Sequence, residues 1–180
     1  MKQALLIIDM QYDNFADSSM TNDQTQAVID HTNQLISHAK AKGMPIYIIE
    51  HISLNPASTL FLADTRGSQT HMQIDTAGTI ALIKHYPSSF RETKLQEHLE
   101  IESITGLIIS GAMTHMCIDT TVRAGNDLGY QITLVSNACF TKDLIFEGHT
   151  VKAADVQVSY MAALEDGFCK VIDTMHFIKS

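Results

Sequence analysis

Short apolar runs alternate with helical segments along this chain, and this alternation restricts the fold more than any other feature of the sequence. The first run covers 4–8 and stops at Asp9, a pattern typical of a strand that is buried on both faces. Further strands are predicted at 46–49, 80–83, 107–109, 132–135 and 169–172. Helices are predicted at 24–42, 117–128 and 149–164, with Gly43 and Gly129 as stop signals after the first two.

Strands that alternate with helices are joined by right-handed crossovers, which place the strands parallel and the helices on both faces of the sheet. The predicted fold class is therefore α/β, a Rossmann-like three-layer sandwich with a mostly parallel sheet. The chain has 180 residues and carries no repeat or linker-like stretch. We therefore expect a single domain over residues 1–180.

Charge and cysteine content disfavour several classes of protein. The chain has 12 Lys and Arg against 20 Asp and Glu, a formal net charge of −8, which disfavours binding to nucleic acid or to anionic membranes. No apolar run approaches the roughly 20 residues of a spanning helix, and Asp9 comes too early for a signal peptide. The three cysteines show neither CxxC nor zinc-site spacing. We expect a cytoplasmic protein with reduced thiols.

Polar residues follow the predicted strands. Asp9, Glu50, His51 and Lys84 each stand just after a strand, and so does the turn 111–117. Ligands of parallel sheets bind beyond the carboxyl ends of the strands, near a switch in strand order, so these groups are expected at one rim. Taken singly, Asp9 fits a solvated loop residue or a helix N-cap, and Lys84 fits a solvated lysine.

Cys117 is the residue of this rim with the clearest chemical role. It stands at the start of the predicted helix, where unpaired N–H groups lower the pKa of a thiol and can hold an oxyanion. The alternative for a lone cysteine is a small buried hydrophobe. Asp9 could act as the base if burial raises its pKa, while the Lys84 ammonium would lower the pKa of the thiol. We expect the three groups within about 3–5 Å of one another.

Three segments of the chain resemble, in order and spacing, the isochorismatase-like cysteine hydrolases, the family of nicotinamidase and N-carbamoylsarcosine amidase. The opening segment is LLIIDMQYDNF at 5–15, similar to the family's strand followed by Asp-Met-Gln. The second is IKHYPSSF at 83–90, which carries the family's lysine. The third is GAMTHMCI at 111–118, which looks like its nucleophile segment. The resemblance covers nearly the whole chain.

This resemblance implies a catalytic triad of Asp9, Lys84 and Cys117 and a cis peptide between Ala112 and Met113. The backbone N–H groups of Met113 and Cys117 would form the oxyanion hole. The implied activity is hydrolysis of a small molecule at a C–N bond through a thioester on the cysteine. The resemblance also implies a homo-oligomer, a dimer or tetramer, and places His149 where members carry a histidine in the next helix.

The walls of the substrate pocket are expected from Phe15, His51, Phe90 and Met116, with core packing as the alternative for the two phenylalanines. No cofactor is expected. No metal is expected either, because the Asp-x-His pair of the metal-binding nicotinamidases is absent after the second strand. Chelation by His51 together with His71 is the disfavoured alternative. The long polar connection 55–76 is a candidate lid.

Two other functions stay open beside amide hydrolysis. One is hydrolysis of another acyl compound, or cleavage of a vinyl ether, on the same scaffold; in the vinyl-ether reaction Asp9 rather than the cysteine would lead. The other is an α/β binding protein without catalysis, because a fold does not determine a function. The intact set Asp9, Lys84 and Cys117 favours an enzyme. Cys139 and Cys169 are expected to be structural.

Overall fold

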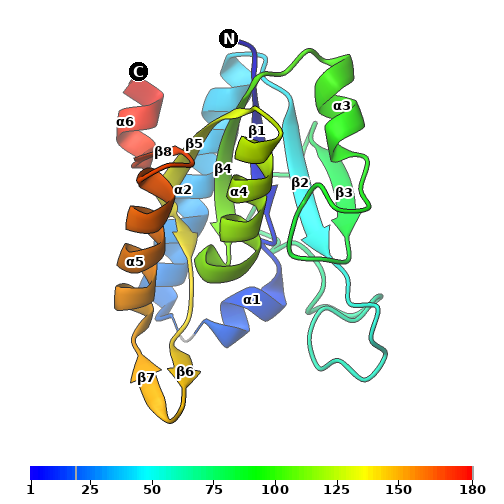
Figure 1. Cartoon of the computed structure of the whole chain (residues 1–180). Coiled ribbons are helices and arrows are strands. Elements are labelled where there is room, and N and C mark those ends of the chain that lie inside the picture. Colours follow the sequence, from blue (N-terminus) through cyan, green and yellow to red (C-terminus); the bar gives the residue numbers. More distant parts are fainter. Residues whose placement is uncertain (19, 180) are drawn as a thin grey trace.

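A six-stranded parallel sheet forms the centre of the computed structural model, which describes residues 1–18 and 20–179. The strand order is β3-β2-β1-β4-β5-β8, and neighbouring strands pair in parallel throughout. The strands are β1 (Gln3–Ile8), β2 (Ile46–His51), β3 (Ile80–Lys84), β4 (Gly106–Ala112), β5 (Gln131–Phe140) and β8 (Lys170–Ile172). In Figure 1 their arrows point to the lower edge of the sheet.

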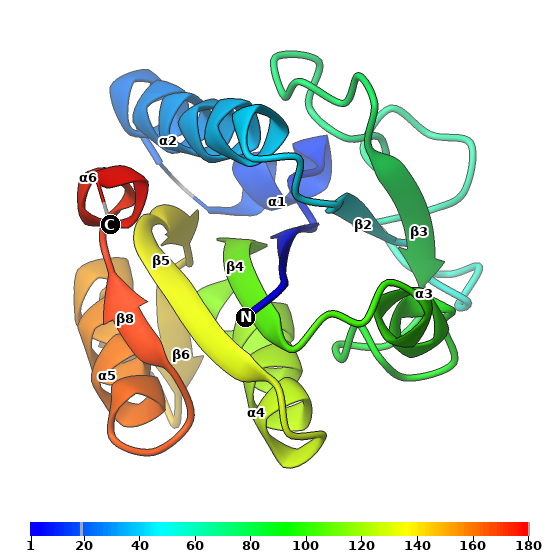
Figure 2. The same ribbon diagram turned by 90° about the horizontal axis from the view of Figure 1, so that it is seen from above.

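Helices cover both faces of this sheet, which confirms the predicted three-layer α/β class. They are α1 (Tyr12–Asp17), α2 (Asn22–Ala41), α3 (Leu95–Ile101), α4 (Asp119–Asp127), α5 (Ala153–Glu165) and α6 (Thr174–Lys179). Helices α2 and α6 pack on one face, and α3, α4 and α5 pack on the other, as the view from above shows (Figure 2). Helix α1 lies at the lower edge of the sheet, below the end of β1 (Figure 1).

Strand β1 supplies side chains to both cores because successive residues of a strand point to opposite faces. Ala4, Leu6 and Ile8 pack into the core under α3, α4 and α5, whereas Leu5 and Ile7 pack into the core under α2. All five side chains are fully buried. Burial of one leucine or isoleucine contributes about 1.5–3 kcal/mol, so β1 anchors the sheet between β2 and β4.

The segment around His149 differs from the sequence-based expectation. The residue lies in β7 (His149–Val151), which pairs antiparallel with β6 (Leu144–Phe146), and helix α5 begins only at Ala153. The prediction of a helix over 149–164 was therefore wrong at its amino end. Glu147 and Gly148 both have positive φ, and this turn chemistry directs the chain into a hairpin instead. In Figure 1 the hairpin projects beyond the lower edge of the sheet.

The helix that carries Cys117 also begins earlier than expected. A π-helical segment covers Thr114–Ile118 and continues into α4. Cys117 therefore lies inside a helical segment and not at its first residue, which corrects the predicted start at 117. Among the described residues, the helices are all too short or too polar to cross a membrane.

Candidate active site

The carboxyl ends of the central strands bring Asp9, Lys84 and Cys117 together. Asp9 directly follows β1, Lys84 is the last residue of β3, and Cys117 lies five residues beyond the end of β4. The chain runs from β1 outward through β2 to β3 and then returns to place β4 on the other side of β1. The site thus lies at the switch in strand order where parallel α/β sheets bind ligands.

The Lys84 ammonium is the centre of this cluster. Its Nζ lies 2.8 Å from Asp9 Oδ2 and 3.1 Å from Cys117 Sγ, which agrees with the convergence expected from the sequence. It also lies 3.2 Å from the carbonyl oxygen of Tyr86 and 3.3 Å from His51 Nδ1. The side chains of Lys84 and Asp9 are 0% and 2% exposed, so this ion pair is shielded from water.

Burial and charge set the protonation of the site. Burial opposes the charge on Lys84, but the Asp9 carboxylate and the Cys117 sulfur outweigh it, so the pKa of Lys84 lies above its ordinary value. Burial and the Asp9 carboxylate raise the pKa of the Cys117 thiol, and the Lys84 ammonium offsets this only in part. The resting site therefore contains an ammonium and a neutral thiol.

The backbone presents Asp9 to the site in an unusual conformation. Its φ is +52°, in the left-handed region that side-chain-bearing residues rarely adopt. The Asp9 N–H donates to the carbonyl oxygen of Ile49 at 2.8 Å, and Asn14 Nδ2 donates to the Asp9 carbonyl oxygen at 2.7 Å. The carboxylate oxygen Oδ1 is buried and has no hydrogen-bond partner among the described residues. Such strained and incompletely paired groups concentrate at functional sites.

The turn before Cys117 depends on close packing between β4 and β1. Gly111 has φ +125°, and a Cβ atom there would lie 1.9 Å from the carbonyl oxygen of Ile8. Only glycine fits this approach. The peptide bond that follows, between Ala112 and Met113 at the end of β4, is cis. Cys117 then lies in the π-helical segment with 8% of its surface exposed.

The expected pocket residues divide into two groups. Phe15 stacks on Phe140 with ring centroids 4.9 Å apart. The His51 ring packs edge-on against Phe61 with ring centroids 5.3 Å apart, and its Nδ1 also contacts Lys84. Met116 is 48% exposed, one residue before the thiol. Of these, only His51 contacts the cluster directly, through Lys84. Phe15 packs against the core under α2, and Phe90 packs against the core under α4 and stacks on Tyr130, so both phenylalanines show the core packing that the sequence left open.

Gln11 is a residue of the site region whose role sequence reasoning missed. It is fully buried; its Nε2 donates to the carbonyl oxygens of His51 and Ser68 at 2.8 and 2.6 Å, and its Oε1 accepts from the His51 N–H at 2.9 Å. Asp13 Oδ2 likewise accepts from the Phe61 N–H at 2.6 Å. Both residues stand in the opening motif, but their partners are 40 or more residues away in sequence.

These bonds tie the connection 55–76 to the start of the chain. The N–H groups of Tyr12 and Asp13 donate to carbonyl oxygens within the connection, and the His71 N–H donates to the carbonyl oxygen of Met10. His71 itself packs against the rings of Tyr12 and Phe15. Over residues 1–18 and 20–179, no group of three His, Cys, Asp or Glu side chains is arranged to hold a metal ion.

Comparisons with known proteins agree with this geometry. The family model described as the isochorismatase domain matches residues 3–174. The uncharacterized isochorismatase family protein YddQ of Bacillus subtilis is 33% identical over 180 residues, covering 99% of this chain and all of its own. A crystal structure from Oleispira antarctica, assigned to the isochorismatase hydrolases, superimposes with a TM-score of 0.91 at 34% identity, covering 99% of this chain and 97% of its own.

A more distant relative has a named activity. Nicotinamidase 3 of Arabidopsis thaliana is 26% identical over 151 residues, covering 77% of this chain and 73% of its own. The match of the family model to almost the whole length, the relative at 33% identity and the shared fold all point to the same assignment. This chain belongs to the isochorismatase family of hydrolases.

Proposed function

We propose that this protein hydrolyses the C–N bond of a small amide through a thioester on Cys117, with Asp9 as the base. The observation that carries the proposal is the shared ammonium of Lys84, 2.8 Å from Asp9 Oδ2 and 3.1 Å from Cys117 Sγ. A thiol, a base and a cation within reach of one another are what covalent catalysis by cysteine needs. The burial of all three side chains favours a small-molecule substrate.

In the first half of the reaction, Asp9 removes the thiol proton and the sulfur attacks the amide carbonyl carbon. The Lys84 ammonium favours the thiolate as it forms, because a neighbouring opposite charge lowers the pKa of a thiol. We assign the developing oxyanion to the backbone N–H groups of Met113 and Cys117. When the C–N bond breaks, Asp9 gives its proton to the leaving nitrogen, which departs as ammonia or an amine.

In the second half, water attacks the carbonyl carbon of the thioester. Asp9 takes one proton from this water as the new C–O bond forms. The C–S bond then breaks, and Asp9 returns the proton to the Cys117 sulfur, so a carboxylic acid leaves and the site regains its starting state. The same carboxylate serves both halves, which agrees with its buried Oδ1 having no fixed partner among the described residues.

Cleavage of a vinyl ether, or of another acyl compound, is the second candidate, and it is supported by the family model that the chain matches, the isochorismatase domain. In the vinyl-ether reaction Asp9 would handle the proton and Cys117 would not become acylated. Amide hydrolysis is favoured because Cys117 is present next to the base and the ammonium, and because a relative named as a nicotinamidase covers three quarters of the chain.

A panel of small primary amides, assayed for released ammonia, tests the proposal. The wild type should release ammonia from at least one member, and Cys117→Ala and Asp9→Asn should lower the rate by at least about 10³-fold. Cys169→Ala is the control, because it removes a free thiol that directly precedes β8, at the amino edge of the sheet and away from Asp9, Lys84 and Cys117. Ammonia release that survives in Cys117→Ala would refute the thioester route and favour the candidate led by Asp9.

A further inference from the structure

A hydrogen-bond network connects the helical segment of Cys117 to the end of β5 and to α5. Thr114, the first residue of the π-helical segment, is fully buried, and its Oγ1 lies 2.7 Å from Gln157 Oε1 on α5. The same hydroxyl lies 3.2 Å from the carbonyl oxygen of Phe140. Gln157 Nε2 donates to the carbonyl oxygens of Ser136 and Cys139 at 3.1 and 3.4 Å.

The two ends of the Gln157 amide have different partners, and this determines its orientation. The amide nitrogen faces two carbonyl oxygens of β5, which accept protons only, so the amide oxygen must face Thr114. The Thr114 hydroxyl is then the donor to Gln157 Oε1. One side chain of α5 thereby joins the irregular end of β5 to the first residue of the helical segment.

We infer that Gln157 is a positioning residue that acts through Thr114 to hold Cys117 Sγ against the Lys84 ammonium. Thr114 precedes Cys117 by three residues in a single helical segment, so a shift of one moves the other. The contact to be preserved is the 3.1 Å between Lys84 Nζ and Cys117 Sγ. The inference rests on the proposed function for its catalytic meaning, whereas the positioning itself can be measured on the thiol alone.

Two other bonds limit the size of the expected effect. His115 Nδ1 lies 2.6 Å from Thr141 Oγ1, and the Thr114 hydroxyl can still donate to the Phe140 carbonyl oxygen, so the helical segment keeps two ties to the end of β5 when Gln157 is replaced. Gln157 also borders a groove of about 420 Å³ between α2, β5 and α5. This space lets a replacement side chain be accommodated without overpacking the core. Substitution of Gln157 should therefore loosen the helical segment without unfolding the protein.

The rate at which iodoacetamide alkylates Cys117, followed from pH 6 to 10 by peptide mass spectrometry, tests the inference. The groups facing this thiol are Asp9, Lys84 and, through Lys84, His51. In Gln157→Met the thiol should lose part of its contact with the ammonium. We expect the rate at pH 7 to fall about fivefold and the rising limb of the pH profile to shift to higher pH by about 0.5–1 unit.

Companion variants separate positioning from general loosening. Thr114→Val should reproduce both changes, Thr114→Ser should restore the wild-type profile, and the double variant Thr114→Val with Gln157→Met should shift no further than either alone, because the two residues share one bond. Asn33→Leu is the matched control. Asn33 is also a helical amide that donates to one backbone carbonyl oxygen, of Gln73, and accepts from one backbone N–H, of Asp75, and it has no bond to the helical segment of Cys117 among the described residues.

The outcomes are distinct. A lower melting temperature with an unchanged Cys117 profile would overturn the inference, and so would faster alkylation, which would mean that the network merely shields the thiol. A change in Asn33→Leu as large as that in Gln157→Met would overturn it as well. If Gln157→Met fails to fold, Thr114→Val tests the same bond. Activity that survives in Cys117→Ala would refute the proposed hydrolysis but would leave the measured positioning of the thiol in place.

Discussion

The two edges of the sheet each carry a lysine paired with a carboxylate, and the two pairs have nearly the same length. At the carboxyl edge, Lys84 Nζ lies 2.8 Å from Asp9 Oδ2, with side-chain exposures of 0% and 2%. At the amino edge, Lys2 Nζ lies 2.9 Å from Glu102 Oε2, with exposures of 52% and 48%. Distance alone therefore does not distinguish a chemical site from a surface ion pair.

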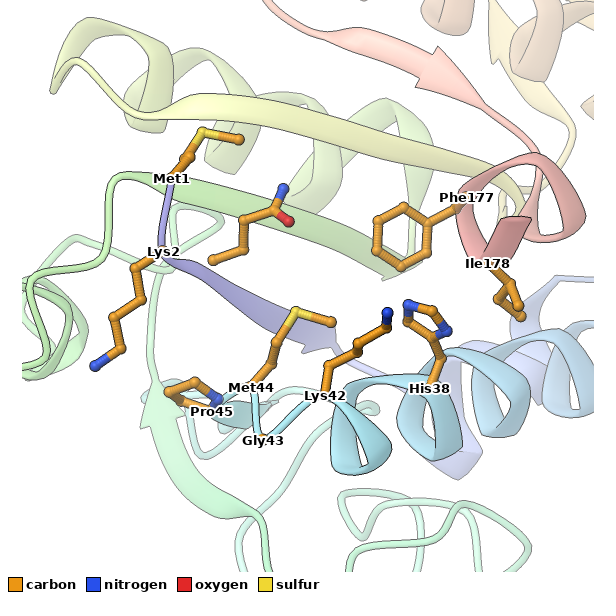
Figure 3. Close-up of a pocket in the computed structure, with 10 residues that line it drawn as sticks. Met1, Lys2, His38, Lys42, Gly43, Met44, Pro45, Phe177 and Ile178 are labelled. Carbon is orange, nitrogen blue, oxygen red and sulfur yellow. The ribbon is translucent and has the colours of Figure 1, made fainter. Parts of the chain in front are cut away.

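The amino edge also has a hollow. A cavity of about 460 Å³ lies there between β1, the end of α2 and α6, lined by His38, Lys42 and Phe177 among others (Figure 3). Figure 3 shows His38, on α2, and Lys42, just beyond its end, extending toward Phe177. No acidic side chain and no cysteine of the described residues lines this cavity, so it lacks the carboxylate and the thiol that the carboxyl edge brings together. Burial combined with convergent chemistry, rather than volume, makes the carboxyl edge the candidate active site.

Replacing the two lysines should give the largest contrast. Lys84→Met leaves the Asp9 carboxylate buried without a partner, which should cost about 3–5 kcal/mol of unfolding free energy, and hydrolysis should fall by at least about 10³-fold. Lys2→Met removes an exposed ion pair and should leave both properties within error of the wild type. Urea titration and the ammonia assay measure the pair of variants. Equal effects of the two substitutions would contradict the importance given to burial.

Alanine substitutions of two glycines, one at each edge of the sheet, should show the same contrast as the lysines. The substitution at the carboxyl edge should cost more stability than the one at the amino edge. In Gly111→Ala the new Cβ would lie 1.9 Å from the Ile8 carbonyl oxygen at a positive φ, so β1 and β4 must separate. We expect a loss of at least about 3 kcal/mol and a displaced Cys117. Gly43→Ala also meets a positive φ, but nothing lies within 4 Å, so about 1–2 kcal/mol is expected. Thermal unfolding ranks the two, and a milder Gly111→Ala would contradict the described close approach.

Acid should lower the stability of the folded protein through protonation of His51 at the carboxyl edge. This effect should be smaller than those of the substitutions above. Burial and then the Lys84 ammonium lower the pKa of His51 in the folded protein, so the folded state favours the neutral ring. Its contribution to stability is present above the ordinary pKa of about 6.5 and is lost as the pH falls through the lower folded value. His51→Gln should therefore flatten the loss of stability between about pH 6.5 and 5, by less than about 1 kcal/mol. Identical pH slopes in wild type and variant would show that His51 is not held neutral.

The parallel sheet and its polar rim could be predicted from the sequence because each depends on local patterns. The apolar run at 4–8 ending in Asp9 is an example: its continuous hydrophobicity indicates a strand buried on both faces. The hairpin at His149 could not be predicted, since a short turn at Glu147 and Gly148 overrides the helical pattern that follows. The hydrogen bonds of Gln11 to His51 and of Thr114 to Gln157 could not be predicted either, because partners 40 or more residues apart in the sequence leave no local signal.

The central claim is that Cys117 becomes acylated during turnover, and peptide mass spectrometry of the quenched enzyme tests it most directly. An amide that the wild type hydrolyses is mixed with enzyme, quenched in acid within the first turnovers, and the protein is digested and analysed by mass spectrometry. We predict an acyl adduct on the peptide that contains Cys117, lost on treatment with hydroxylamine, with Cys139 and Cys169 unmodified. Full hydrolysis by Cys117→Ala, with no adduct on the wild type at any quench time, would contradict the account.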